Sequence, residues 1–118
     1  MSQAKSPAAA ATASPAAPAS TPADRAAADR AQAQQLLDKA IALIKAQKLD
    51  EAEGVLGDLM SRHPGEPEVW YNAGGVAKLR KETERAVQRM RKAVSLAPTV
   101  AKYRHDLGRL LFELGRID

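Results

Sequence analysis

Apolar residues recur along the middle of the chain at the spacings of helices that bury one face. Leu36, Ala40 and Leu43 lie at i, i+4 and i+7 and predict one such helix. A fuller stripe at i, i+3, i+4, i+7 and i+8 predicts a second, core-facing helix, and its members are Ala52, Val55, Leu56, Leu59 and Met60. The pattern therefore predicts a pair of amphipathic helices between residues 36 and 60.

The sequence also contains signals for where these helices begin and end. Thr21-Pro22-Ala23-Asp24 combines a hydroxyl cap, an early proline and an acidic residue, so we expect one long first helix from Pro22 to Ala46. His63-Pro64-Gly65 should end the second helix, because proline lacks an amide donor and glycine adopts a positive φ easily. The first predicted helix thus has a physical start signal and the second a physical stop signal.

The two-helix pattern returns after 34 residues. The second pair of stripes comprises Val69, Trp70, Ala73, Val76 and Ala77, followed by Ala86, Val87, Met90, Ala93 and Val94. Residues matching at this offset are Pro64 with Pro98, Ala52 with Ala86, Leu56 with Met90, Leu59 with Ala93, and Gly74 with Gly108. A fixed period of this length indicates a helical solenoid. The small residues among these positions should lie where helices approach closely.

Trp70, Gly74, Ala86, Ala93 and Pro98 carry a family resemblance. Their spacing resembles that of the tetratricopeptide repeat (TPR), a 34-residue helix–turn–helix unit. The resemblance implies an all-α fold, a right-handed solenoid of about two and a half repeats. The implied TPR-like domain is 22–118, with repeats at 33–66 and 67–100 and a partial repeat at 101–118. Two departures are Ala77, where the family usually has tyrosine, and Lys81, where the turn usually has glycine.

The N-terminal segment 1–21 has a different composition from the repeats. It consists almost wholly of alanine, proline, serine and threonine, so we expect it to be disordered. Its alanine tract lacks the apolar core of a secretory signal. We therefore expect a cytoplasmic protein, with a periplasmic one as the alternative. The richness in alanine, arginine and proline suggests a bacterial source.

Bulk composition excludes several classes of function. The chain has no cysteine and two histidines, which leaves no thiolate site and too few ligands for a metal centre. No stretch approaches the roughly 20 apolar residues of a membrane span. The net charge of +4 is mild, and the basic run from Lys78 to Lys92 lacks aromatic partners for nucleic acid. We interpret that run, with Arg85, Arg89 and Lys92 on one face, as a solvated helix surface.

The TPR resemblance also implies a binding surface. The inward positions of the first helix of each repeat would line a concave groove for a protein or peptide, and here they are Gln34, Leu37, Asp38, Ile41, Ile44, Lys45, Glu68, Tyr71, Asn72, Gly75, Lys78, Leu79, Lys102, His105, Asp106, Arg109, Phe112 and Glu113. Leu37, Ile41 and Ile44 form a second apolar stripe, which either packs inside the fold or holds a partner helix. Only Asn72 and Lys102 match the relatives that grip chaperone tails, which argues against that ligand.

The last predicted helix is unusually apolar for the end of a solenoid, with Leu107, Leu110, Leu111, Phe112 and Leu114. Either the chain is the front of a longer protein, or this face binds another subunit and gives a homo-oligomer. No catalytic or cofactor motif is present in the sequence. We therefore predict a non-catalytic interaction scaffold that needs no cofactor. The alternative is the N-terminal part of a larger bacterial enzyme, such as a sulfotransferase or glycosyltransferase, an inference from analogy.

Overall fold

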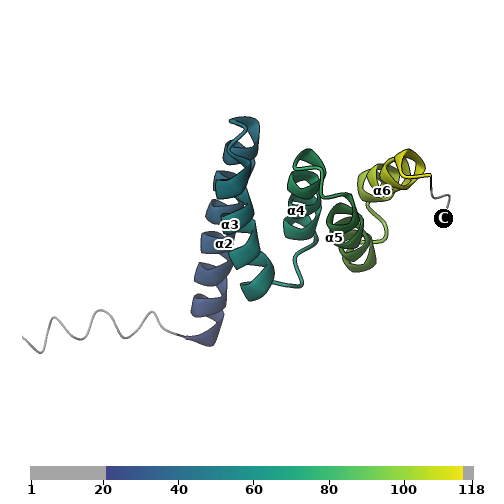
Figure 1. Cartoon of the computed structure of the whole chain (residues 1–118). Coiled ribbons are helices and arrows are strands. Elements are labelled where there is room, and N and C mark those ends of the chain that lie inside the picture. The colour runs from purple at the N-terminus through teal and green to yellow at the C-terminus, as the bar shows by residue number, and fades with distance from the viewer. Residues whose placement is uncertain (1–20, 116–118) are drawn as a thin grey trace, which may run out of the picture. The chain divides into compact units, whose positions relative to one another are not determined.

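The computed structural model describes residues 21–115, and these form five helices without a strand (Figure 1). The helices are α2 (Pro22–Lys45), α3 (Leu49–Arg62), α4 (Pro67–Leu79), α5 (Thr83–Leu96) and α6 (Ala101–Glu113). The predicted all-α class is confirmed. The tail expected at 1–21 lies outside the described residues except for Thr21. The chain divides into two compact units between Gln32 and Ala33.

The first part of α2 begins as the sequence predicts. The Thr21 hydroxyl oxygen accepts a hydrogen bond of 3.0 Å from the Asp24 amide, which satisfies one of the amides that the helix leaves open. Pro22 occupies the first position, where its missing donor costs nothing. Residues 21–32 are all exposed. The cap and the backbone hydrogen bonds therefore form this part of the helix without the burial of any side chain of residues 21–32.

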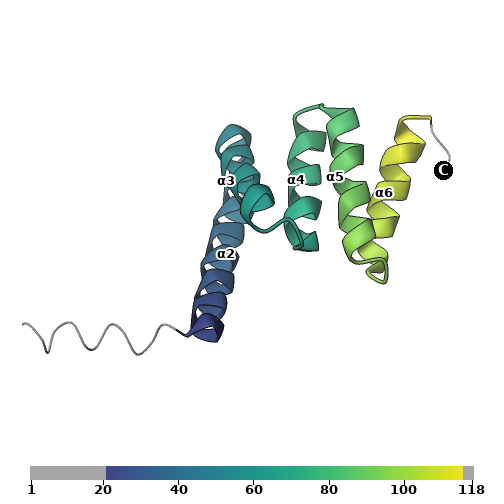
Figure 2. The same cartoon turned by 90° about the horizontal axis from the view of Figure 1, so that it is seen from below.

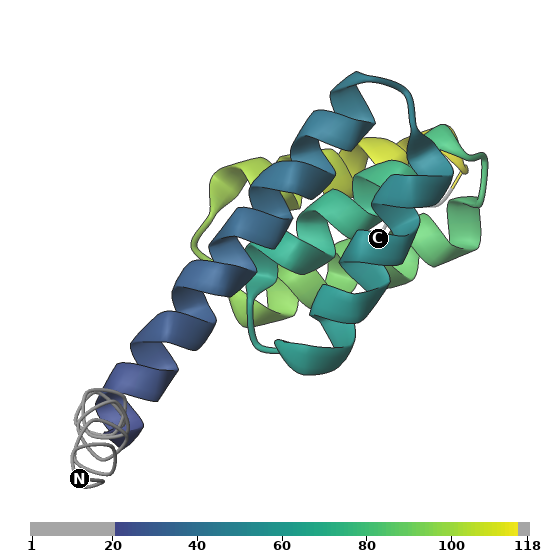
Figure 3. The same cartoon turned by 90° about the vertical axis from the view of Figure 1, so that its left-hand side faces the viewer.

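In the second unit, successive helices pack on one another in chain order. Helix α4 packs against both α3 and α5, and α5 packs against α6 (Figure 2). Residues 33–45 of α2 share a core cluster with α3, and a tight turn joins these two helices (Figure 3). Each helix therefore buries its apolar face against its neighbours in sequence, which is the arrangement of an all-α solenoid.

The 34-residue period is also present in the backbone. Gln47 and Lys81, which are 34 residues apart, have φ angles of 63° and 67°, and Gly115, a further 34 along, has φ of 78°. After α2 the Lys48 amide donates to the Leu43 carbonyl at 2.9 Å, and after α4 the corresponding bond from Glu82 to Ala77 is 2.8 Å. These bonds close the same left-handed helix cap after α2 and after α4. Lys81 adopts the conformation that glycine usually supplies.

The turn between α3 and α4 departs from one expectation. Helix α3 ends at Arg62, just before Pro64, as predicted. Gly65, however, has no positive φ, since Gly115 is the glycine with a left-handed backbone in the described part of the chain. The turn is held instead by the Trp70 indole, which donates to the Pro64 carbonyl at 2.8 Å. The predicted role of Gly65 is therefore wrong, and the proline together with the Trp70 bond replaces it.

The core consists of two clusters with small residues at the helix contacts. The first contains Leu37, Ala40, Ala52, Leu56, Leu59, Val69, Ala73 and Val76. The second contains Ala77, Ala86, Val87, Met90, Leu110 and Leu111. A methyl group added at Gly74 would lie 3.0 Å from the Cγ of Met90, so the close approach of α4 and α5 requires glycine there.

Leu37 and Leu36 exchange the places expected for them. Leu37, predicted to face a partner, is only 4% exposed and belongs to the first core cluster, whereas Leu36 packs on the edge of that cluster. Adjacent residues differ by about 100° around a helix, so the rotation of α2 about its axis decides which leucine is inside. Of the two alternatives for this stripe, packing inside the fold is therefore the one that applies to Leu37.

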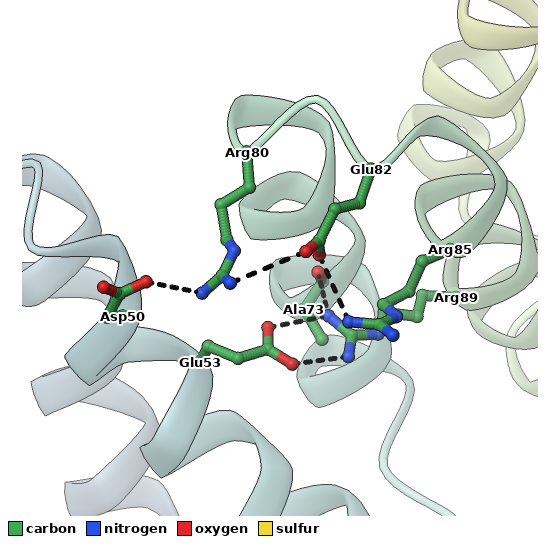
Figure 4. Close-up of polar contacts among 7 residues, drawn as sticks. All are labelled: Asp50, Glu53, Ala73, Arg80, Glu82, Arg85 and Arg89. Atoms are coloured by element: carbon green, nitrogen blue, oxygen red, sulfur yellow. Dashed lines mark hydrogen bonds and ion pairs between the residues drawn. The ribbon is translucent and has the colours of Figure 1, made fainter.

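A charged cluster joins α3, α4 and α5 (Figure 4). Arg89 donates to both carboxylate oxygens of Glu53, at 2.9 Å and 2.6 Å, and also to the Ala73 carbonyl at 3.0 Å. At its edge Arg80 pairs with Asp50 at 2.8 Å. The Arg89 side chain is 11% exposed, so its predicted place on a solvated face is wrong. The sequence pattern on α5 could not reveal a partner 36 residues away.

Candidate partner-binding groove

Tyr71 organises the surface between α4 and α6. Its ring stacks on Tyr103 with 4.7 Å between centroids, and its hydroxyl donates a hydrogen bond to the Asp106 carboxylate. The Lys102 ammonium lies over the Tyr71 ring, 5.1 Å from the ring centroid. Burial and then the Asp106 carboxylate raise the pKa of Tyr71 to about 12. The hydroxyl therefore stays protonated and a donor across the physiological range.

A hollow of about 320 Å³ lies beside Tyr71. It is lined from α2, α4, α5 and α6 by Ile44, Tyr71, Asn72, Gly75, Lys78, Leu79, Met90, Asp106, Arg109 and Leu110. Gly75 forms part of its wall, and a methyl group at that position would meet nothing within 4 Å. Leu79 is 47% exposed although it is a large apolar residue. The hollow therefore offers accessible apolar surface beside a helix backbone.

The polar groups of the hollow differ in how firmly they are held. The Asn72 amide donates to the Glu68 carbonyl at 2.8 Å, and the Asp106 carboxylate is committed to Tyr71. Lys78 approaches Glu113 at 3.9 Å, with both side chains about half exposed, so this pair contributes little. Asn72 and Asp106 thus have fixed positions, whereas the Lys78 ammonium can turn toward a ligand.

Comparison with known proteins places this geometry in a wider group. No protein-family model matches the sequence, and no curated protein does. Among solved structures, the chain is similar to MamA (residues 41 to the end) from Desulfovibrio magneticus RS-1, with 25% identity and a TM-score of 0.65 over 68% of this chain. A MamA RS-1 ArsTM double mutant gives the same identity and TM-score over 69% of this chain. MamA is a TPR protein.

The chain has the tetratricopeptide-repeat fold. The match spans 45% of the first MamA chain and 46% of the second, so less than half of those chains is represented here. The predicted resemblance to TPR proteins is confirmed by this likeness. The fold supports a role in protein interaction in general.

The structure brings together part of the set that the TPR pattern indicated. Ile44, Tyr71, Asn72, Gly75, Lys78, Leu79, Asp106 and Arg109 line one hollow, and Lys102 contacts its edge through Tyr71. His105 and Phe112 line a different hollow along α6. On α2, Asp38 accepts a hydrogen bond of 3.0 Å from Gln34, Lys45 is exposed, and Ile41 packs on the core. The TPR positions therefore divide between two surfaces and the interior.

Three residues of the groove were not foreseen from the TPR pattern. Tyr103 supports Tyr71 by stacking, and Met90 and Leu110 line the hollow, although the sequence places Met90 on a core-facing stripe and Leu110 on the apolar face of the last helix. Burial raises the pKa of Tyr103, with a smaller contribution from Glu68. Two tyrosines, one on each of two successive first helices, could have suggested the stacking, since such helices are neighbours in a solenoid.

The residues that the structure describes form neither a metal-binding cluster nor a membrane span. Between residues 21 and 115, no three His, Asp or Glu side chains are grouped so that they could hold a metal ion. None of the helices in that range is both long enough and apolar enough to span a bilayer. The candidate site of the described residues is the groove beside Tyr71, which combines apolar walls with polar groups held by hydrogen bonds.

Proposed function

We propose that the protein is an interaction scaffold that binds a polypeptide segment in the groove beside Tyr71. The observation that carries this proposal is the hollow of about 320 Å³ formed jointly by α2, α4, α5 and α6. Concave sites that combine apolar walls with a few fixed polar groups are typical of ligand binding. The TPR fold, whose known members are typically non-catalytic, supports the same role.

The lining suggests how such a segment would be held. An apolar side chain of the partner would contact the exposed Leu79 and the half-buried Ile44, above the buried Leu110. Gly75 allows the partner to approach the α4 backbone closely, because no side chain stands between them. Asn72 and Tyr71 offer fixed polar atoms, and Lys78 offers a movable charge. The helices are already in place, so little ordering cost opposes binding.

The remaining sequence-based hypotheses are part of this proposal. We propose the repeat limits 33–66, 67–100 and 101–118, and a protein or peptide as the partner. Nothing in residues 21–115 favours the alternative, the front of a larger enzyme, over a scaffold. The groove set that we propose from the structure is Ile44, Tyr71, Asn72, Gly75, Lys78, Leu79, Lys102, Asp106 and Arg109.

The experiment blocks the groove without disturbing the fold. Peptides are selected from a displayed random library on the wild-type protein, and their affinities are then compared for wild type and Gly75→Trp. The matched control is Gly54→Trp, since Gly54 is an exposed helical glycine on α3 with the same open space around it. We expect Gly75→Trp to weaken binding at least ~10-fold by steric exclusion, and the control to bind normally. Equal binding by all three proteins would refute a role for this groove.

A further inference from the structure

The outer face of α6 carries an apolar projection beside a gap. Phe112 is 79% exposed, more than any other large apolar residue that the structure describes. Gly108 lies one helical turn before it, and both line a hollow of about 360 Å³. The remaining lining consists of Arg104, His105, Arg109 and Glu113. The face therefore presents a knob and a hole on one surface, four residues apart.

The hole at Gly108 is the counterpart of a filled contact within the fold. Gly74 occupies the equivalent position on α4, 34 residues earlier, and Met90 of α5 closes it at 3.0 Å. At Gly108 an added methyl group would meet nothing within 4 Å. The α6 surface thus repeats, on its open side, the site where an apolar side chain seats between α4 and α5. A methionine or an aromatic ring fills such a gap without strain.

We propose that α6 pairs with α6 of a second copy of this chain, so that Phe112 of each copy enters the hole at Gly108 of the other. In this pair the helices run antiparallel, and the two-fold axis passes at the level of Leu110. Residues at equal distances before and after Leu110 in the sequence then face each other across the interface. Phe112 and Gly108 are such a pair. One surface then supplies both halves of the contact, which is the requirement for a closed two-fold dimer. An unrelated helix would need its own knob and hole at the same spacing.

The charges along α6 favour the same arrangement. With this axis, Glu113 of one copy faces Leu107 of the other, two positions from Arg109. Arg109 forms no ion pair within residues 21–115, and the contact of Glu113 with Lys78 is long, at 3.9 Å. Each interface would therefore gain two Arg109–Glu113 pairs related by the axis. The proposal goes beyond groove binding, because the outer face of α6 is separate from the hollow beside Tyr71 except for Arg109.

The association should be weak, because a single helix face buries little area. We expect a dissociation constant on the order of 100 µM, which analytical ultracentrifugation of the full chain from about 10 µM to about 1 mM would measure. The weight-average mass should rise from 12.6 kDa toward twice that value. A mass that stays at the monomer value across this range overturns the proposal.

Two substitutions test the knob and the hole separately. Phe112→Ala removes the knob, and Gly108→Leu fills the hole; both positions are exposed, so the fold should be retained. Each should weaken the dimer at least ~30-fold, as loss of a central anchor does. Gly54→Leu, at an exposed helical glycine on α3, is the control and should dimerise as the wild type does. Circular dichroism of every variant verifies helix content. A dimer that neither Phe112→Ala nor Gly108→Leu weakens would overturn the proposal.

Cysteine cross-linking tests the antiparallel register, since the natural chain has no cysteine. In the proposed dimer the two copies of residue 109 lie about 3 Å apart along the axis, whereas the two copies of residue 104 lie about 18 Å apart at 1.5 Å per residue. Arg109→Cys should therefore form a disulfide dimer readily, and Arg104→Cys should not. Equal cross-linking at both positions would indicate a parallel or random pairing and would overturn the arrangement.

Discussion

The pair between Glu53 and Arg89 allows a direct measurement of what holds the two repeats in register. Glu53→Gln keeps the shape of the side chain and removes its charge. In the native protein, Arg89 donates two hydrogen bonds to this carboxylate and a third to the Ala73 carbonyl. After the substitution, the guanidinium remains largely enclosed but faces a neutral amide.

The burial of the pair sets the expected magnitude. The side chains of Arg89 and Glu53 are 11% and 23% exposed, so the pair lies between a solvated and a fully buried one. Breaking a solvated pair costs about 0.2–1 kcal/mol, and breaking a buried one costs about 3–5 kcal/mol. We expect Glu53→Gln to lower the free energy of unfolding by about 2 kcal/mol. For a domain of this size, the melting temperature should fall by roughly 8–16 °C.

Urea unfolding followed by circular dichroism at 222 nm measures this loss. The control is Arg62→Gln, which breaks the exposed pair with Asp58 at 3.2 Å, where the side chains are 62% and 46% exposed. That change should cost less than about 0.5 kcal/mol. Adding Arg89→Met completes a double-mutant cycle and isolates the coupling between the two side chains. If Glu53→Gln costs no more than Arg62→Gln, burial does not strengthen this pair and the reasoning is wrong.

Two further predictions concern the same scaffold. The hydrogen bond from Arg89 holds the pKa of Glu53 below its ordinary value of 4.5. The unfolded chain therefore binds this proton more readily than the folded protein does. The stability from Glu53 is present above pH 4.5 and is lost as the pH falls through the lower native pKa. In urea titrations, the free energy of unfolding should fall more steeply with acid for wild type than for Glu53→Gln. Lys81→Gly should raise the free energy of unfolding by about 0.5–1 kcal/mol, because Lys81 has φ of 67°. Arg80 has φ of −85° and pairs with Asp50, so Arg80→Gly should destabilise the fold. The same response from both substitutions would contradict the argument.

Much of the fold follows from local patterns in the sequence. The stripes around Ala52–Met60 and Ala86–Val94 recur every three or four residues, which commits each segment to a helix with one apolar side. Thr21 and Pro64 mark where helices begin or end through their own hydrogen-bonding chemistry. Helix α2 ends at Lys45, one residue before the predicted Ala46. These features depend on neighbours within a few residues, so the sequence alone determines them.

The groove and the contacts across it depend on residues far apart in the chain. Tyr71 meets Asp106 at a separation of 35 residues, and Arg89 meets Glu53 at 36, so each pairing exists only when the helices are stacked. The choice between Leu36 and Leu37 depends on a rotation of α2 that its packing sets. Periodicity places a side chain on a helix face, but only the stacked helices decide what that face meets, because burial and ion pairing involve both partners at once.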